Sequence, residues 1–339
     1  MKLKLFFLCI ILVMASLNAN AQNNDLQQIR SRGYVACGTN TNNKALAYKD
    51  KDGEWSGIDA NICKLFAIAV LGNEDAFEMV NIPSPKASNA LKNGKIDFML
   101  GNNALSANQE ISSSMSIVDI LYFDKQIFAS RHKPETNSME SFKGSKVCVV
   151  SQSFEEENLN EYNQRYVMKF KIIPFPDENA AKNAFYLGRC PLISNGEINL
   201  HHVKNSLVAK NNDITLLPEV ISERPIYVYC DKNKTHLRIM GKWILNAIKL
   251  AEQYGINSKN IESFIGIKSK SIKNLLGINQ ELWNKFGINP NWLKQALPII
   301  GNYGEFYDRN LGYDSELKIS REKNKLLKDG GYIATSPFI

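Results

Sequence analysis

A short polar loop, Gly101-Asn102-Asn103, has the residue types best suited to binding a small ligand. It follows an apolar run, Ile96–Leu100, which begins just after the turn signal Asn93-Gly94 and is typical of a buried strand. A helix-like segment begins after the loop. Open α/β sheets bind ligands at such loops, where free backbone N–H groups and the helix dipole favour anions. The sequence therefore predicts a ligand-binding loop here, with a plain strand–loop–helix connection as the alternative.

Three acidic residues, Asp59, Asp97 and Glu110, have side chains suited to acid–base chemistry. Such chemistry needs an acid aimed at the substrate and usually a cation for the substrate's carboxylate, and no arginine falls on an identifiable pocket position. The pair His201-His202 is a weak metal signal, because adjacent helix residues point about a third of a turn apart and rarely bind one ion. We therefore expect no catalytic residue, no metal site and no cofactor.

Strand and helix patterns alternate along the chain, and each half repeats the order strand, loop, helix, strand, helix, strand, loop. The first half runs from the strand pattern at residues 34–38 to the loop after Leu100. The second half runs from the strand pattern at residues 147–150, through the loop Gln152-Ser153-Phe154, to Asn195-Gly196. This alternation favours an α/β fold with a mainly parallel sheet.

Two glycines in the first half of the chain indicate where elements end. The segment Lys51-Asp52-Gly53-Glu54 is typical of a hairpin turn. An apolar helix pattern at Ile62–Leu71 stops at Gly72, a residue type common just after a helix end.

Long elements follow the first half and return to it. The strand pattern Asp119–Arg131 leads into the second half, and strands expected at Ile214–Val220 and Pro225–Cys230 lead back. Residues 236–254 have apolar side chains at helical spacing. Residues 302–339 are expected to form a polar tail with little core.

The composition limits the classes of protein to consider. With 339 residues, 44% of them hydrophobic and 22% charged, the chain is long enough for two domains and is not broadly disordered. The net charge is +7, but Lys and Arg are scattered and form no basic run interleaved with aromatics. Nucleic-acid binding is therefore not expected.

The first residues have the features of a cleavable export signal. A positively charged start precedes the apolar stretch Leu5–Met14, which is too short to span a membrane comfortably. Ala19-Asn20-Ala21 fits a cleavage site, so we expect a mature chain that begins at Gln22. No later segment has a long uncharged apolar run. A soluble, exported protein located in the periplasm is expected.

The cysteine count agrees with export, which permits disulfides. Of six cysteines, Cys9 leaves with the signal segment and five remain. Their spacing matches no zinc pattern. The natural pairing joins Cys37 to Cys63 and Cys148 to Cys190, which leaves Cys230 free, but the sequence alone leaves the connectivity open.

Several motifs together resemble one protein family. The segment CGTNTNNKALAYKDKDGEWSGIDANIC resembles the start of the general L-amino-acid-binding proteins of bacterial ABC importers, which are periplasmic solute-binding proteins of the polar amino acid type. The resemblance covers essentially all of residues 29–338. Further matching motifs are VCVV from Val147, LGRC from Leu187, LPEVISERP from Leu217, GNYGEFYDRNLG from Gly301 and GGYIATSPF from Gly330.

This resemblance implies the type II periplasmic-binding-protein fold, with two α/β lobes joined by two crossing strands. It also implies a ligand held between lobes that close on it, the two disulfides named above, and an ABC permease in the inner membrane as partner. A monomer is expected. The expected organisation is a signal peptide at 1–21, the first lobe at 22–128 and 223–300, the second lobe at 129–222, and a C-terminal helical or extended extension at 301–339.

The chain departs from the family pattern where charge recognition is needed. Enclosing an amino-acid zwitterion strips its water, so the carboxylate needs a bidentate Arg and the ammonium needs an Asp or Glu. The family Arg position holds Gln109, and the Thr before it is Ala104. The family Asp position holds Gly196. The aromatic that packs on the ligand falls on Leu46, and the family Gly-Thr-Thr loop falls on Gln152-Ser153-Phe154.

Neutral residues thus replace both charged clamps. Gln109, Asn102, Asn103 and Asn195 can donate and accept hydrogen bonds, which suits a neutral polar solute better than a zwitterion. If the alignment slips by one position, Glu197 takes the amine role. The leading hypothesis is a solute-binding component of an amino-acid-type importer. The alternatives are an interaction protein on the same scaffold, without transport, and a dehydratase-like enzyme.

Overall fold

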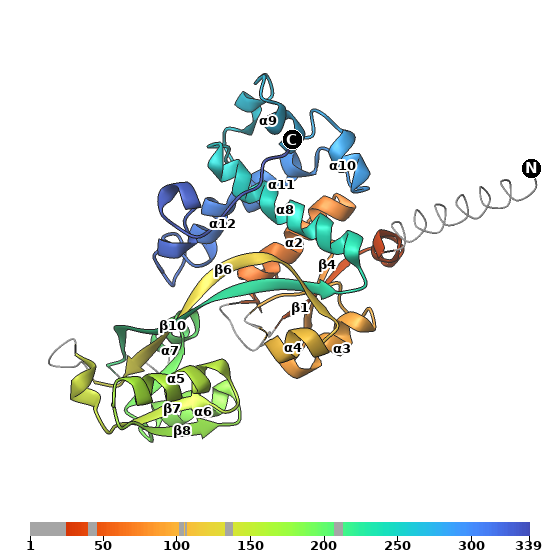
Figure 1. The fold of residues 1–339 in the computed structure, drawn as a ribbon. Helices are drawn as coiled ribbons and strands as arrows, with labels where there is room; N and C mark the ends of the chain where they lie inside the picture. Colours follow the sequence, from red (N-terminus) through yellow and green to blue (C-terminus); the bar gives the residue numbers. More distant parts are fainter. Residues whose placement is uncertain (1–24, 40–45, 102–104, 106, 133–137, 207–212) are drawn as a thin grey trace, which may run out of the picture.

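The computed structural model describes residues 25–39, 46–101, 105, 107–132, 138–206 and 213–339. These residues form two α/β lobes joined by a pair of long strands (Figure 1). The predicted signal segment and Asn102, Asn103 and Ala104 lie outside the described residues. In the part of the chain described, no helix has the length and apolar character needed to cross a membrane.

The described strands, apart from a short hairpin, form one eight-stranded sheet in the order β4-β1-β5-β10-β6-β9-β7-β8. On each side of the crossing pair, the strands of one lobe run parallel to one another. This confirms the α/β alternation read from the sequence. The strands are β1 (Val35–Thr39), β4 (Phe77–Asn81), β5 (Phe98–Met99), β6 (Met115–Ser130), β7 (Lys146–Val150), β8 (Lys171–Phe175), β9 (Leu192–Gly196) and β10 (Thr215–Asp231).

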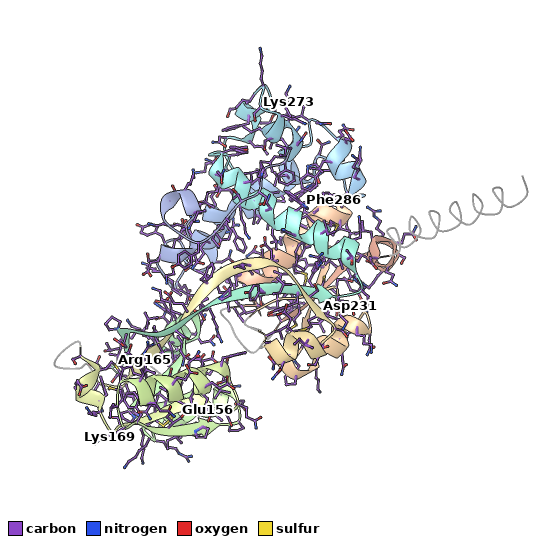
Figure 2. The ribbon with its side chains drawn as sticks, viewed as in Figure 1. Glu156, Arg165, Lys169, Asp231, Lys273 and Phe286 are labelled. Atoms are coloured by element: carbon purple, nitrogen blue, oxygen red, sulfur yellow. A yellow bond between two sulfur atoms is a disulfide. The ribbon has the colours of Figure 1, made fainter. Side chains whose placement is uncertain are left out.

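The antiparallel strands β6 and β10 cross between the lobes and confirm the predicted crossing pair. β10 also pairs with β5 of one lobe, and β6 pairs with β9 of the other. The two strands expected at residues 214–220 and 225–230 are therefore parts of one strand, with register shifts near its middle. Figure 2 labels Asp231, the last residue of β10, in the first lobe. It also labels Glu156 and Arg165, on helix α5 (Phe154–Arg165), in the second lobe.

In the first lobe, helix α2 (Ile58–Leu71) and helix α8 (Thr235–Gln253) lie beside the sheet. α2 starts at Ile58 rather than at the predicted Ile62, because Gly57 adopts a positive φ of 103° that turns the chain into the helix. It ends where predicted, with Gly72 in the left-handed conformation.

In the second lobe, helices α5 (Phe154–Arg165), α6 (Glu178–Tyr186) and α7 (Glu197–Asn205) pack around the sheet. The side chains of Ser153 and Asp177 accept backbone hydrogen bonds at the starts of α5 and α6. The remaining described elements are a helix at residues 25–32, β2 (Tyr48–Lys49), β3 (Trp55–Ser56), η1 (Ser84–Lys86), α3 (Ala87–Lys92), α4 (Ala107–Ser112), η2 (Met139–Phe142), η4 (Ile261–Phe264), α9 (Lys270–Leu275), α10 (Glu281–Lys285), α11 (Trp292–Ile300), α12 (Tyr303–Asn310), η5 (Glu322–Asn324) and η6 (Leu327–Asp329).

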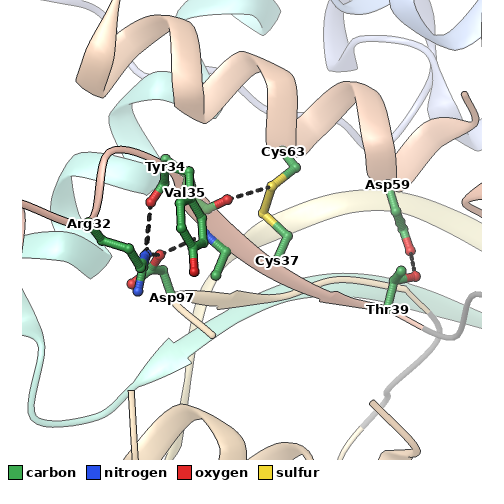
Figure 3. Close-up of a disulfide and its surroundings, with 9 residues drawn as sticks. Arg32, Tyr34, Val35, Cys37, Thr39, Asp59, Cys63 and Asp97 are labelled. Carbon is green, nitrogen blue, oxygen red and sulfur yellow. Dashed lines mark hydrogen bonds and ion pairs between the residues drawn. A yellow bond between two sulfur atoms is a disulfide. The ribbon is translucent and has the colours of Figure 1, made fainter. Parts of the chain in front are cut away.

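Both predicted disulfides are confirmed, and each lies in the core of one lobe. Cys37 is bonded to Cys63 (Figure 3), and Cys148 is bonded to Cys190. Cys230 is free and buried, as the natural pairing predicted.

The expectation of a polar C-terminal tail with little core is wrong. α12 begins with a capping box formed by Asn302 and Glu305, and the segment that follows packs on the first lobe. The ring of Phe338 is 1% exposed and lies against Trp243 and Trp283. Other buried apolar residues of this extension are Tyr303, Phe306, Tyr307, Leu311, Leu317, Ile319, Leu326 and Ile333.

Candidate functional site

The carboxyl ends of the parallel neighbours β7 and β9 bring two predicted binding segments to the same edge of the sheet. Gln152-Ser153-Phe154 follows β7, and Asn195-Gly196 ends β9. The Gln126 side chain of β6 joins them, because its Nε2 donates to the carbonyl of Glu155 (2.8 Å) and to Oγ of Ser194 (2.9 Å). The lobe therefore presents these predicted residues as one group.

Within this group, most polar atoms already hold the local structure. The Ser153 hydroxyl donates to the carbonyl of Val150 and accepts from the N–H of Glu156. The Asn195 side-chain oxygen accepts from the N–H of Gly196 at 2.7 Å. The Gln152 backbone, at a φ of 56°, donates to the Glu156 carboxylate. These bonds fix the shape of the edge.

Leu46 belongs to the other lobe, where it lies beside Asp59 and Gly101. Its carbonyl accepts the N–H of Asp59 at 2.9 Å, and a Cβ added to Gly101 would contact both side chains. Asp59 is fully buried, and its Oδ2 accepts a hydrogen bond from the Thr39 hydroxyl (Figure 3). Its Oδ1 has no hydrogen-bond partner among the described residues. Burial raises the pKa of Asp59 to about 7, and the Thr39 hydroxyl partly offsets this.

Gln109, at the family Arg position, lies exposed on α4, a short helix with no buried residue. α4 belongs to the first lobe, whereas the ends of β7 and β9 belong to the second (Figure 1). The role of Gln109 in ligand binding stays a prediction.

Two charged residues of the crossing strands lie at this edge and were not found from the sequence. Asp124 is on β6 and Arg224 is on β10, and Arg224 Nη1 lies 2.7 Å from Oε1 of Glu155. Arg224 Nη2 is buried and lies 3.9 Å from Oδ2 of Asp124, and within the part of the chain that the structure describes it has no hydrogen-bond partner. Burial raises the pKa of Asp124 to about 6, and Arg224 opposes this increase. The sequence offered weak signals only: Asp124 is a charge inside the predicted strand Asp119–Arg131, and Arg224 lies in the motif LPEVISERP, between the two strands expected there.

Gly196 lies directly against Asp124. A Cβ added to Gly196 would come closer than 3.0 Å to Oδ2 of Asp124, a separation that real Cβ atoms essentially never show. Arg224 Nη2 would lie 3.5 Å from the same Cβ. The crossing strand therefore occupies the space into which a larger side chain at position 196 would project.

Two other acidic candidates lie elsewhere. The carboxylate of Asp97 binds the Arg32 side chain and accepts the N–H of Ala36 at 2.8 Å, so it fastens the start of β1 (Figure 3). Glu110 is exposed on α4. Across the described residues, no group of three or more His, Cys, Asp or Glu side chains could hold a metal ion.

Comparison with known proteins decides the family. The sequence model of the bacterial extracellular solute-binding proteins, family 3, matches residues 35–287. The chain belongs to this family. Its two-lobe fold and crossing strands agree with that membership, and its relatives are solute-binding proteins rather than enzymes.

Relatives match nearly the whole chain. The general L-amino acid-binding periplasmic protein AapJ of Rhizobium johnstonii is 28% identical over 98% of both chains. The putative amino-acid ABC transporter-binding protein YhdW of Escherichia coli (strain K12) is 26% identical over 90% of both.

Among solved structures, a periplasmic binding protein from Brucella ovis with glutathione bound is similar at a TM-score of 0.85. It is 28% identical, and the match covers 92% of this chain and 98% of that one. ArgBP of T. maritima, at 18% identity and a TM-score of 0.54 over 68% of this chain and 96% of that one, shares the fold.

Proposed function

We propose that this chain is the extracytoplasmic solute-binding component of an amino-acid-type ABC importer, located in the periplasm. Near full-length similarity to AapJ, whose name states that it binds L-amino acids, carries the proposal. The similarity to YhdW supports it further, since that protein is named as a putative binding protein of an amino-acid ABC transporter. The partner of this chain would be an ABC permease, and we expect a monomer.

The ligand is a small polar solute held between the lobes. The carboxyl ends of β7 and β9 supply Ser153 and Asn195 on one side, and Leu46 lies on the other. The Brucella ovis protein has glutathione bound, so this scaffold accommodates solutes larger than one amino acid. Gln109 and Gly196 stand where the family has a charged clamp, so the ligand contacts differ from those of a standard amino-acid-binding protein.

Lobe closure about the crossing strands would enclose the ligand. In this proposal the first lobe comprises residues 22–128 and 223–300, the second lobe residues 129–222, and the extension residues 301–339. The boundaries near 128 and 222 fall inside β6 and β10, the strands that connect the two cores. A hinge of two strands permits closure because only two segments have to bend.

The test is a ligand search on the chain from residue 22 to residue 339. Native mass spectrometry would first detect any small molecule that co-purifies. A thermal-shift screen would then use the twenty amino acids, glutathione and neutral polar solutes. A ligand at a hundred times its Kd should add about 2.7 kcal/mol to the free energy of unfolding. Saturable stabilisation by at least one solute is expected. If every solute leaves the midpoint unchanged and a protein partner is captured instead, the interaction-protein alternative holds.

A further inference from the structure

The lack of space for a side chain, and not the backbone conformation, explains why residue 196 is a glycine. Gly196 has φ −57° and ψ 144°, angles that any residue adopts. A Cβ there would collide with the Asp124 carboxylate, as described above. The carboxylate that the family pattern has on the side chain of residue 196 is therefore present at the same place, but it comes from the neighbouring strand β6.

Asp124 is fixed in a way that leaves one oxygen available. Its Oδ1 accepts the N–H groups of Lys125 at 3.0 Å and Ile198 at 3.5 Å. Its Oδ2 accepts no hydrogen bond from any described residue, and Arg224 Nη2 at 3.9 Å is beyond hydrogen-bond distance. A carboxylate that is 7% exposed at its side chain and has one oxygen without a donor can gain a strong charge-assisted hydrogen bond.

Several charged side chains surround Asp124. Arg224 contacts both Asp124 and Glu155, and Lys125 forms an ion pair with Glu322. Burial raises the pKa of Glu178, which Lys182 and Arg224 oppose, and it raises the pKa of Glu197, which Lys125 opposes. These pairs leave Oδ2 of Asp124 with no cation at hydrogen-bond distance among the described residues, since Arg224 Nη2 lies 3.9 Å away.

We propose that Asp124 is the residue that binds a cationic amine of the ligand, and that Gly196 is the position that makes room for it. This inference rests on the proposed solute-binding function and assigns its ligand class: a small solute with a free ammonium group, such as an amino acid or short peptide. Arg224 is a positioning residue, because it holds Asp124 and Glu155 together without any assigned contact to the ligand. The ligand is therefore not a neutral solute, contrary to the expectation from Gln109 and Gly196 alone.

Glu197 is the competing carboxylate, because it follows Gly196 directly. It begins α7, and Lys125 and Asp124 are among the charges that act on it. The two assignments predict different results. Substitution of the residue that binds the amine should remove the preference for the free amine, and substitution of the other carboxylate should leave that preference unchanged.

The experiment measures Kd by titration calorimetry on the chain from residue 22 to residue 339. The probes are amino acids and glutathione, each paired with its N-acetyl derivative, which lacks the ammonium charge. The variants are Asp124→Asn and Glu197→Gln. The matched control is Glu161→Gln, an exposed carboxylate on α5 of the second lobe.

For the parent protein and Glu161→Gln, the free amine should bind at least about 30-fold more tightly than its N-acetyl partner, the range for a buried charge pair. Asp124→Asn should lose most of that preference, and Glu197→Gln should keep it. Loss in Glu197→Gln with retention in Asp124→Asn would overturn the assignment. Equal binding of both members of every pair would overturn the amine assignment and leave the solute-binding function intact. Absence of binding by every probe would count against the function, and the inference would fall with it.

Discussion

The side chain of Asn324 accepts the backbone N–H of Phe123 at 2.7 Å and donates to the carbonyl of the same residue at 3.0 Å. Asn324 belongs to the C-terminal extension and Phe123 to the crossing strand β6. Neighbouring ion pairs join Lys125 to Glu322 and Glu223 to Lys323, so the extension holds both crossing strands. The extension is therefore attached to the hinge as well as to the first lobe.

Replacing Asn324 by Ala should destabilise the protein by about 1–3 kcal/mol, because both hydrogen bonds to the backbone of Phe123 and a longer one to the Tyr307 hydroxyl are lost. Urea unfolding of the ligand-free protein measures this. Asn108→Ala, at an exposed position of α4, is the control and should change stability by less than about 0.5 kcal/mol. Equal effects of both substitutions would show that the extension does not support the hinge.

Phe338→Ala should cost about 3–5 kcal/mol, the usual range for truncating a fully buried aromatic. The ring is 1% exposed and lies between two tryptophans, Trp243 and Trp283. Tyr313→Ala is the control, because Tyr313 lies in the same extension but is 83% exposed. If Phe338→Ala is as mild as Tyr313→Ala in urea unfolding, the chain end is not part of the core.

Asp59→Asn should stabilise the protein at high pH only. The pKa of Asp59 is about 7 in the fold, against 3.8 as the ordinary value. Below about pH 4 the carboxyl group is protonated in both the folded and the unfolded state, so it does not lower the free energy of unfolding. Between these values only the unfolded state releases the proton, so the free energy of unfolding falls as pH rises, and the loss is complete above about pH 7.

The variant should therefore be about 2 kcal/mol more stable than the parent at pH 8 and no more stable at pH 4. This gain is smaller than the full pKa difference implies, because the amide would keep a buried polar atom at the place of Oδ1, which has no partner among the residues that the structure describes. Unfolding curves at both pH values measure it, with exposed Asp75→Asn as the control. A gain that is equal at pH 4 and pH 8 would contradict the buried-carboxylate explanation.

Gly196→Ala should destabilise the ligand-free protein by about 1–3 kcal/mol, the usual cost of overpacking, because the new methyl group collides with Asp124. Most of this cost should vanish in an Asp124→Ala background, which a double-mutant cycle measures. Gly266→Ala is the control, since no atom lies within 4 Å of its added Cβ. A cost that is the same in both backgrounds would mean that Asp124 is not the obstacle.

Local patterns predicted the elements that depend on local chemistry. Gly72 ends α2 because glycine adopts the left-handed conformation without strain, and the alternating strands and helices gave the α/β sheet. The disulfide pairing followed from the cysteine positions together with the resemblance. The buried C-terminal extension was missed because its apolar residues are separated by polar ones in an irregular chain, which has no period to recognise.

The candidate site could be predicted only in part. The loop after β7 and the end of β9 were located, because parallel strands place their carboxyl ends at the same edge. Asp124 and Arg224 were missed because their proximity to Gly196 depends on strand register: Gln126 pairs with Gly196, and Arg224 pairs with Asp124. The register of these strands cannot be derived from the spacing of residues along the sequence.

Ligand-dependent lobe closure tests the central claim most directly. Spin labels at Lys92→Cys on α3 and Glu157→Cys on α5 report the distance between the lobes, because these exposed positions lie on different lobes. The pair Glu157→Cys and Lys171→Cys, both on the second lobe, is the control. On addition of pooled amino acids and glutathione, the distance between the lobes should shorten while the control distance stays constant. A distance between the lobes that no pool changes, in a folded protein, would contradict the account.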